Sequence, residues 1–122
     1  MLEYEYKAIF YDLPNGELPA EKFMLTLDKK MRAKLIRAIN IIKERGALVR
    51  EPYSKHLDDG IFEVRAQVGT DISRVLYFFI VGKKFIITHG FVKKTQKTPT
   101  SEIQLAKKYR AEYLSREDAD ND

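Results

Sequence analysis

Hydrophobic and polar positions between Gly60 and Val92 predict three consecutive β-strands. In Ile61–Gln67 the apolar and charged residues alternate, which is typical of a strand with one buried face. Arg74–Val81 is apolar throughout after its arginine, as expected of a strand that is covered on both faces. The dipeptide Gly82-Lys83 then predicts a tight turn, so Lys84–Phe91 pairs with the preceding strand as a hairpin.

Helical periodicity dominates the first half of the chain. Apolar residues recur at helical spacing in Lys29–Arg45, opposite a strongly basic face. Asp28 is the expected N-cap of this helix, and Gly46 is expected to end it. The pattern also predicts an opening strand, a short helix that begins at a proline, and a long loop: Glu3–Leu13, Pro19–Leu27 and Ala47–Asp59.

A last helix is predicted over Pro99–Leu114, with Thr98 as its N-cap. The residues after Leu114, SREDADND, are acidic and poor in apolar side chains, so we expect residues 115–122 to be disordered. Residues 1–114 are predicted to form one domain. The predicted order is β-α-α-β-β-β-α, an α+β fold with helices packed on a mostly antiparallel sheet.

Length and composition limit the class of protein. The chain has 122 residues, 44% of them hydrophobic, which suits one domain with one core. Its longest apolar run, Val75–Val81, is far shorter than the roughly 20 residues of a membrane helix, and MLEYEYKAIF lacks the features of a signal peptide. The chain contains no cysteine, which fits a reducing compartment. A soluble cytoplasmic protein without a membrane partner is therefore predicted.

The charge is unevenly distributed along the chain. The net charge is +4, and without the acidic residues 115–122 it becomes +7. Between Lys83 and Arg110 there are eight basic residues and one acidic residue, Glu102. A basic surface on a small domain favours a polyanionic partner such as nucleic acid, although it is also compatible with ordinary solubility.

Several kinds of chemistry are not indicated. The two histidines are 33 residues apart and match no metal-binding pattern, so no metal site is predicted. The glycines form no phosphate-binding loop, and no serine lies in a nucleophile elbow. No cofactor is predicted.

Cations on the predicted sheet are the remaining candidates. Arg65 lies on the polar face of its strand and Arg74 begins the next strand, so a short connection brings the two guanidinium groups together. Such a pair can bind a phosphodiester and stabilise negative charge as it develops, and Lys93 and Lys94 could serve the same anion. The alternative is a structural ion pair across the strands, with Glu63 as the expected partner.

The histidines are the candidates for proton transfer. His56, in a polar loop beside Lys55, is the first choice because an imidazole titrates near neutral pH. His89 follows Phe85 and Ile87 in alternation and is interpreted as a hydrogen-bonded residue of the core. An exposed loop histidine without a catalytic role is the alternative for His56.

The second half of the chain resembles a known family. The segments GIFEVR, SRVLYFF, THGFVKKTQKTP and EIQLAKKYRAEYL follow one another as in the RelE/HigB-like toxins of bacterial type II toxin–antitoxin systems. The resemblance is closest to the phage-derived branch of that superfamily. It is strong over Leu57–Leu114 and extends to the order and length of the preceding elements.

This resemblance implies an mRNA interferase, an endoribonuclease that cuts translated mRNA on the ribosome and is neutralised by an antitoxin protein. The matching positions assign catalysis to Arg65, Arg74, Lys93 and Lys94, with His56 as the proposed base. The segment TQKTPTSE lacks the tyrosine that some members carry there, and Glu63 stands where some relatives have lysine. Neighbouring cations are expected to bind RNA: Lys55, Lys83, Lys84 and Lys97.

Two other functions stay open. ParE-like members of the same superfamily poison DNA gyrase without cutting RNA, although they generally lack clustered basic catalytic residues. A non-catalytic toxin-fold protein that only binds its antitoxin or a nucleic acid is the other alternative.

Overall fold

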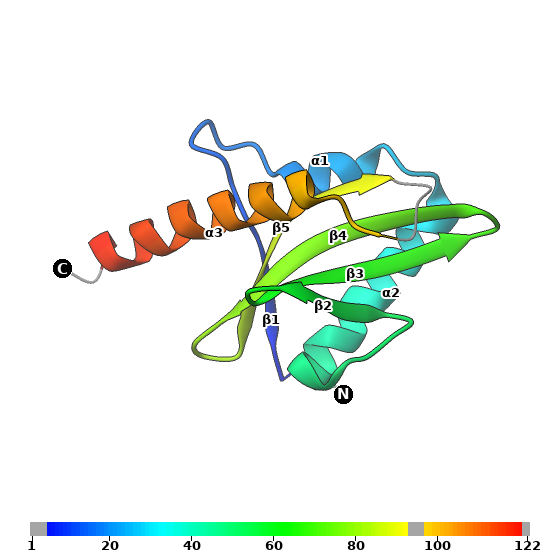
Figure 1. Ribbon diagram of the computed structural model, residues 1–122, viewed down its shortest axis with the longest axis horizontal. Helices are drawn as coiled ribbons and strands as arrows, with labels where there is room; N and C mark the ends of the chain where they lie inside the picture. The colour runs from blue at the N-terminus through cyan, green and yellow to red at the C-terminus, as the bar shows by residue number, and fades with distance from the viewer. Residues whose placement is uncertain (1–4, 93–96, 121–122) are drawn as a thin grey trace.

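The computed structural model describes residues 5–92 and 97–120, which form one mixed five-stranded sheet and three α-helices (Figure 1). This confirms the predicted α+β class. The elements in chain order are β1 (Lys7–Phe10), α1 (Pro19–Leu25), α2 (Lys29–Arg45), the 3-10 turn η1 (Gly46–Leu48), β2 (Ser54–Asp58), β3 (Ile61–Val68), β4 (Asp71–Ile80), β5 (Lys84–Val92) and α3 (Thr100–Asp120).

The strands lie in the order β1-β5-β4-β3-β2. β2, β3, β4 and β5 are joined by antiparallel pairings, while β1 pairs with β5 in parallel. The sheet is therefore mostly antiparallel, as predicted, with β4 at its centre. β2 and β1 are its two edge strands.

Local sequence explains the bounds of α2. The carboxylate of Asp28 accepts a hydrogen bond from the backbone N–H of Met31 at 2.9 Å, which caps the first turn. At the other end Gly46 has a φ of 60°, and a Cβ at this position would collide with the ring of Tyr6. The prediction for both ends of this helix is confirmed.

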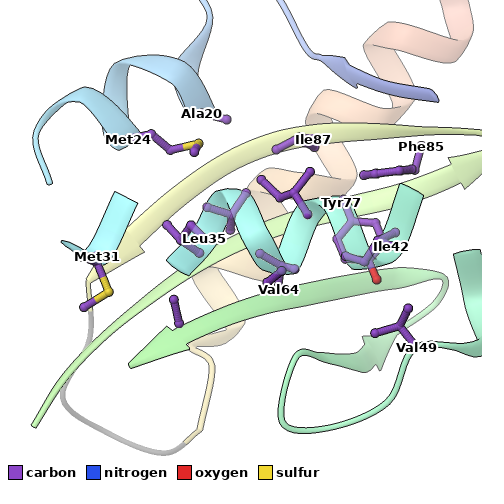
Figure 2. Close-up of a cluster of buried hydrophobic side chains, with 14 residues drawn as sticks. Ala20, Met24, Met31, Leu35, Ile42, Val49, Val64, Tyr77, Phe85 and Ile87 are labelled. Carbon is purple, nitrogen blue, oxygen red and sulfur yellow. The ribbon is translucent and has the colours of Figure 1, made fainter. Parts of the chain in front are cut away.

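The two faces of the sheet carry separate hydrophobic clusters. On one face α1 and α2 pack against Val64, Val75, Tyr77, Phe85 and Ile87. Figure 2 shows Leu35 and Ile42 of α2 directed toward Val64 and Tyr77 of the sheet. On the other face Leu76, Phe78 and Ile86 pack beneath Ala106 of α3. The sheet is thus covered on both sides, which is why the second half of β4, Val75–Ile80, is apolar throughout.

Three arginine and lysine side chains fasten α3 to the rest of the fold. Lys107 Nζ lies 2.6 Å from Asp58 Oδ2 and Arg110 Nη2 lies 2.9 Å from Asp59 Oδ2, so the two tie the helix to the end of β2 and to the turn that follows it. Arg116 Nη1 lies 2.8 Å from Asp12 Oδ1, beyond the end of β1. Helix α3 therefore joins segments next to both edge strands.

Two elements differ from the prediction. β2 lies within the segment expected to be a loop, because SKHLD has no apolar alternation that marks a strand. The helix α3 continues to Asp120, so it includes residues 115–120, which we expected to be frayed or disordered. Its extension is stabilised by Arg116, which also binds the carboxylate of Glu112 one turn earlier.

The start of α3 is also different. Thr98 does not cap the helix, because its hydroxyl donates to Oε1 of Glu63 at 3.1 Å. The carbonyl of Pro99 instead accepts the first backbone hydrogen bonds, from Glu102 and Ile103.

In the described part of the chain, no helix combines the length and the apolar character needed to span a bilayer.

Candidate functional site

Arg65 and Arg74 lie directly opposite each other in the β3–β4 ladder. Residues opposite each other in an antiparallel pair share a face of the sheet, with Cα atoms about 4.5–5.5 Å apart. The expectation that the strand connection brings these two arginines together is confirmed. Both lie on the face that α3 covers, because Val64 and Val75, the next pair along, belong to the cluster under α2.

The two arginines differ sharply in exposure. The side chain of Arg74 is 0% exposed and that of Arg65 is 25% exposed. Arg74 belongs to the central strand β4, between β3 and β5, whereas Arg65 lies in β3 where the pairing with β2 ends. The prediction that Arg74 forms part of an exposed anion-binding surface is therefore wrong.

A single carboxylate holds both guanidinium groups. Glu63 is 1% exposed, and its Oε1 lies 3.1 Å from Nε of Arg74, while its Oε2 lies 3.5 Å from Nη2 of Arg65. This is the cross-strand ion pair that the sequence left open as an alternative. Burial lowers the pKa of Arg74, whereas the Glu63 carboxylate raises it and Arg65 lowers it further. The formal charge of the three side chains is +1, and Arg65 presents it to solvent.

Thr98, just before α3, also contacts this cluster. The hydroxyl of Thr98 donates to the same Glu63 Oε1 that contacts Arg74, and Thr98 is itself buried. The buried carboxylate therefore fixes three parts of the chain at once: β3, β4 and the start of α3. It also limits the positions that the Arg65 guanidinium can take.

A pocket of about 370 Å³ opens beside Arg65, between β2, β3 and the start of α3. It brings together four of the cationic or titratable residues that the sequence singled out, since Lys55, His56, Arg65 and Lys97 all line it. The full lining is Glu51, Lys55, His56, Leu57, Glu63, Arg65, Lys97, Thr98 and Ile103. We refer to this hollow as the basic pocket.

His56 lies in β2 and not in a loop. Its ring packs edge-to-face on Phe62 at 5.0 Å, and its Nε2 is 3.1 Å from the backbone N–H of Gly60. An N–H donor directed at Nε2 assigns the proton of the neutral ring to Nδ1. His56 can therefore donate from Nδ1, and it must release Gly60 before Nε2 can accept a proton from a substrate.

Two carboxylates also line the basic pocket. Glu63 is committed to the arginines, while Glu51 is exposed and its Oε1 lies 3.9 Å from Nζ of Lys55. The sequence analysis did not single out Glu51. No signal in the sequence pointed to Glu51, because its place at the pocket depends on how the chain enters β2, which the sequence did not predict as a strand.

His89 is buried and lies outside the basic pocket. Its Nδ1 is 3.2 Å from Oγ1 of Thr88, and its Nε2 is 3.7 Å from Oε2 of Glu102 in α3. Burial lowers the pKa of His89 to about 4, so the ring is neutral at physiological pH. The interpretation of His89 as a core histidine is confirmed, and its burial argues against a role as a base.

The face on which His89 lies could not be predicted by simple alternation. A register shift between Leu76 and Tyr77 places His89 opposite Leu76, whereas Ile87 lies opposite Tyr77. A bulge of this kind moves the following side chains to the other face of the sheet. His89 therefore contacts Tyr109 of α3, at 5.7 Å between ring centres, while Ile87 packs under α2.

Two further predicted cations, Lys83 and Lys84, do not join the basic pocket. Lys83 lies in the β4–β5 turn, 3.3 Å from Glu5, and Lys84 is opposite Ile80. Ile80 lies six residue steps along β4 from Arg74, which corresponds to roughly 20 Å. Lys93 and Lys94 lie outside the described residues.

The chemistry of the basic pocket is that of an anion site. Within the described ranges, no three histidine, aspartate or glutamate side chains lie close enough together to hold a metal ion. The pocket instead offers one guanidinium and two ammonium groups, which suit a phosphate group.

Comparison with known protein families assigns the chain to one of them. Residues 22–111 match the model of the family described as phage-derived protein Gp49-like (DUF891). The chain belongs to this family. The match runs from α1 into α3 and includes every residue of the basic pocket. The Gp49-like family is associated with RelE-like toxins, so a toxin-like protein with an antitoxin partner is compatible with the match. No curated protein matches the sequence.

Proposed function

We propose that this Gp49-like protein is the toxin of a type II toxin–antitoxin system and an endoribonuclease of the RelE/HigB type. In this proposal the ribosome presents translated mRNA to the basic pocket, and a cognate antitoxin blocks it. The observation that carries the proposal is the convergence of Arg65, Lys55 and Lys97 on one hollow with His56. Polyanion binding also fits the net charge of +4.

The reaction would be the attack of an mRNA 2′-hydroxyl on the adjacent phosphate. The bond from the 2′-oxygen to phosphorus forms, and the bond from phosphorus to the 5′-oxygen breaks. The 2′-proton passes to a base, and the departing 5′-oxygen takes up a proton. The products are a 2′,3′-cyclic phosphate and a 5′-hydroxyl, with no change in oxidation state.

Arg65 is the residue that we place at the reacting phosphate. Its guanidinium is partly exposed and is fixed from behind by the buried Glu63, so it is oriented before the substrate arrives. A preoriented cation stabilises the charge that develops on the non-bridging oxygens. Lys55 and Lys97 would bind the same or the neighbouring phosphate.

The role of His56 follows from its hydrogen bond. In the conformation observed, Nδ1–H can donate to a phosphate oxygen, and Nε2 is occupied by Gly60. Removal of the 2′-proton by Nε2 would require this bond to open on substrate binding. We propose His56 as the base under this condition.

Two features favour a second candidate function, a toxin-fold protein that binds without cleaving. Arg74 is fully buried, and Glu63 contributes a negative charge within ion-pair distance of both arginines. Both features lower the positive charge that is available to a reacting phosphate. RNA cleavage therefore has to be tested directly.

The decisive experiment maps mRNA cleavage by primer extension in a bacterial translation extract. Wild type is compared with Arg65→Ala and with Lys22→Ala. The second variant is the control, because Lys22 lies in α1 and does not line the basic pocket. We expect ribosome-dependent cuts with wild type and Lys22→Ala, and a loss of about 100-fold with Arg65→Ala. Intact mRNA in the extract would exclude the nuclease and leave a gyrase poison or a binding protein.

A further inference from the structure

A second hollow of about 330 Å³ lies on the other side of Arg65, between α2 and the free edge of β3. Its lining contains three cationic side chains and no carboxylate. The lining residues are Lys34, Arg37, Ala38, Pro52, Tyr53, Arg65, Ala66 and Gln67. We call this hollow the edge pocket.

The shortness of β2 creates the edge pocket. Its ladder with β3 runs only as far as Ser54 opposite Val64, and the carbonyl of Tyr53 accepts one further bond, from Arg65 N–H at 3.0 Å. Beyond this point the last residues of β3 have no strand on their outer side. Lys34 of α2 reaches across and donates to the carbonyl of Gln67 at 2.8 Å, which closes one end of the hollow.

Arg65 connects the edge pocket to the basic pocket. Arg65 lines both hollows, and it is the only residue that the two linings share within the described chain. A ligand with regularly spaced anionic groups can therefore place one group at Arg65 and continue in either direction. A flexible, extended polyanion has this property, whereas a single small anion does not.

The side chains of the edge pocket suit a nucleotide. Tyr53 is 43% exposed, so its ring is available for a base to stack on it. Arg37 is exposed, and no carboxylate of the described residues lies within ion-pair distance of it. Aromatic rings interspersed with cationic side chains are typical of surfaces that bind single-stranded nucleic acid.

We propose that the edge pocket is a second RNA subsite, in which a base stacks on Tyr53 while Arg37 and Lys34 bind the phosphates beside it. Single-stranded RNA would run from the basic pocket past Arg65 and around the edge of β3. This proposal rests on the proposed function in taking RNA as the ligand. The edge-pocket proposal adds to that function the residues that hold the nucleotide next to the one that is cleaved.

The test is the binding of short, fluorescein-labelled 2′-O-methyl oligonucleotides, which lack the attacking hydroxyl and are not cut. Fluorescence anisotropy compares wild type with Tyr53→Ala, Tyr53→Phe, Arg37→Ala and the control Lys22→Ala. A hexanucleotide can reach both pockets, whereas a dinucleotide can fill only one.

For the hexanucleotide we expect Tyr53→Ala to weaken binding about tenfold, and Tyr53→Phe to restore it, because a phenyl ring stacks equally well. Arg37→Ala should lower the slope of log affinity against log salt by about 0.7, as for one lost contact to a single-stranded phosphate. The dinucleotide should bind wild type and Tyr53→Ala with more similar affinity. Circular dichroism checks that each variant is folded.

The outcomes separate this proposal from the one on which it rests. Hexanucleotide affinity unchanged in folded Tyr53→Ala and Arg37→Ala would overturn the subsite and leave the nuclease proposal intact. No binding of any oligonucleotide by wild type, with no cleavage on the ribosome, would overturn both. If the same variants keep their affinity for RNA but no longer bind a co-expressed antitoxin, the edge pocket is the site of a protein partner, and the RNA subsite is overturned.

Discussion

Oε1 of Glu63 lies 3.1 Å from Nε of Arg74, and both side chains are almost completely buried. The pair occupies the interior beside the basic pocket, where it orients the more exposed Arg65. Removing one member of a buried ion pair leaves the other charge without compensation in a poorly solvated site. The stability of the fold and the geometry of the pocket are therefore linked through this carboxylate.

We expect Arg74→Ala to lower the free energy of unfolding by about 3–5 kcal/mol, because Glu63 loses its fully buried partner. Urea denaturation followed by circular dichroism measures this change. Arg65→Ala is the matched control, since it removes the partly exposed arginine from the same carboxylate and should cost about 1 kcal/mol or less. Equal effects of the two substitutions would contradict a structural role for Arg74.

His56→Gln should reduce mRNA cleavage by about 100-fold if His56 transfers the 2′-proton, the lower end of the usual range for general base catalysis. The fold should be preserved, because the side chain is exposed in the edge strand β2. Primer extension in the translation extract measures the cleavage. A variant that cuts mRNA at the wild-type rate would remove His56 from the mechanism.

The buried His89 should make the protein less stable in mild acid. Its folded pKa of about 4 lies below the ordinary value of 6.5, so between these values the unfolded chain binds more protons than the folded one. The free energy of unfolding should therefore decrease as the pH falls from 6.5 toward 4, by about 3 kcal/mol in total from this group. Thr88 and Glu102 are the polar groups that face the ring.

Urea denaturation between pH 4.5 and 7 measures this effect. His89→Asn should show a shallower dependence on pH than wild type. A slope that is the same in His89→Asn and wild type would place the acid sensitivity in other groups.

Arg116→Ala should loosen the C-terminal half of α3. The guanidinium of Arg116 donates to the side chain and the backbone carbonyl of Asp12, at 2.8 and 2.6 Å, and it lies 5.2 Å from the ring centre of Tyr11. We expect a loss of about 1–2 kcal/mol, discounted for the partial exposure of the group, and faster amide exchange in the last turns. Lys108→Ala, on the exposed side of the same helix, should leave both quantities unchanged.

Local signals in the sequence were sufficient for the elements that carry them. The bounds of α2 follow from its apolar stripe, the Asp28 cap and Gly46, and the β4–β5 hairpin follows from an apolar run and a glycine turn. The pairing of Arg65 with Arg74 could be predicted as well, because a short connection sets the register.

Long-range contacts decided what the sequence did not show. SKHLD forms a strand only because β3 offers it a ladder, and the bulge beside Leu76 turns His89 toward α3. The carboxylate that pairs with Arg74 is also held by Thr98, which lies 24 residues after Arg74 in the chain. None of these contacts has a local pattern in the sequence.

The attachment of α3 near both edges of the sheet also has a mechanical consequence. Lys107 and Arg110 hold it beside β2, and Arg116 holds it beyond β1, so the helix acts as a strut across five strands. Twisting the two edge strands against each other would have to break these ion pairs. The helix therefore opposes movement of β2, the strand that carries His56, and of the basic pocket that β2 lines.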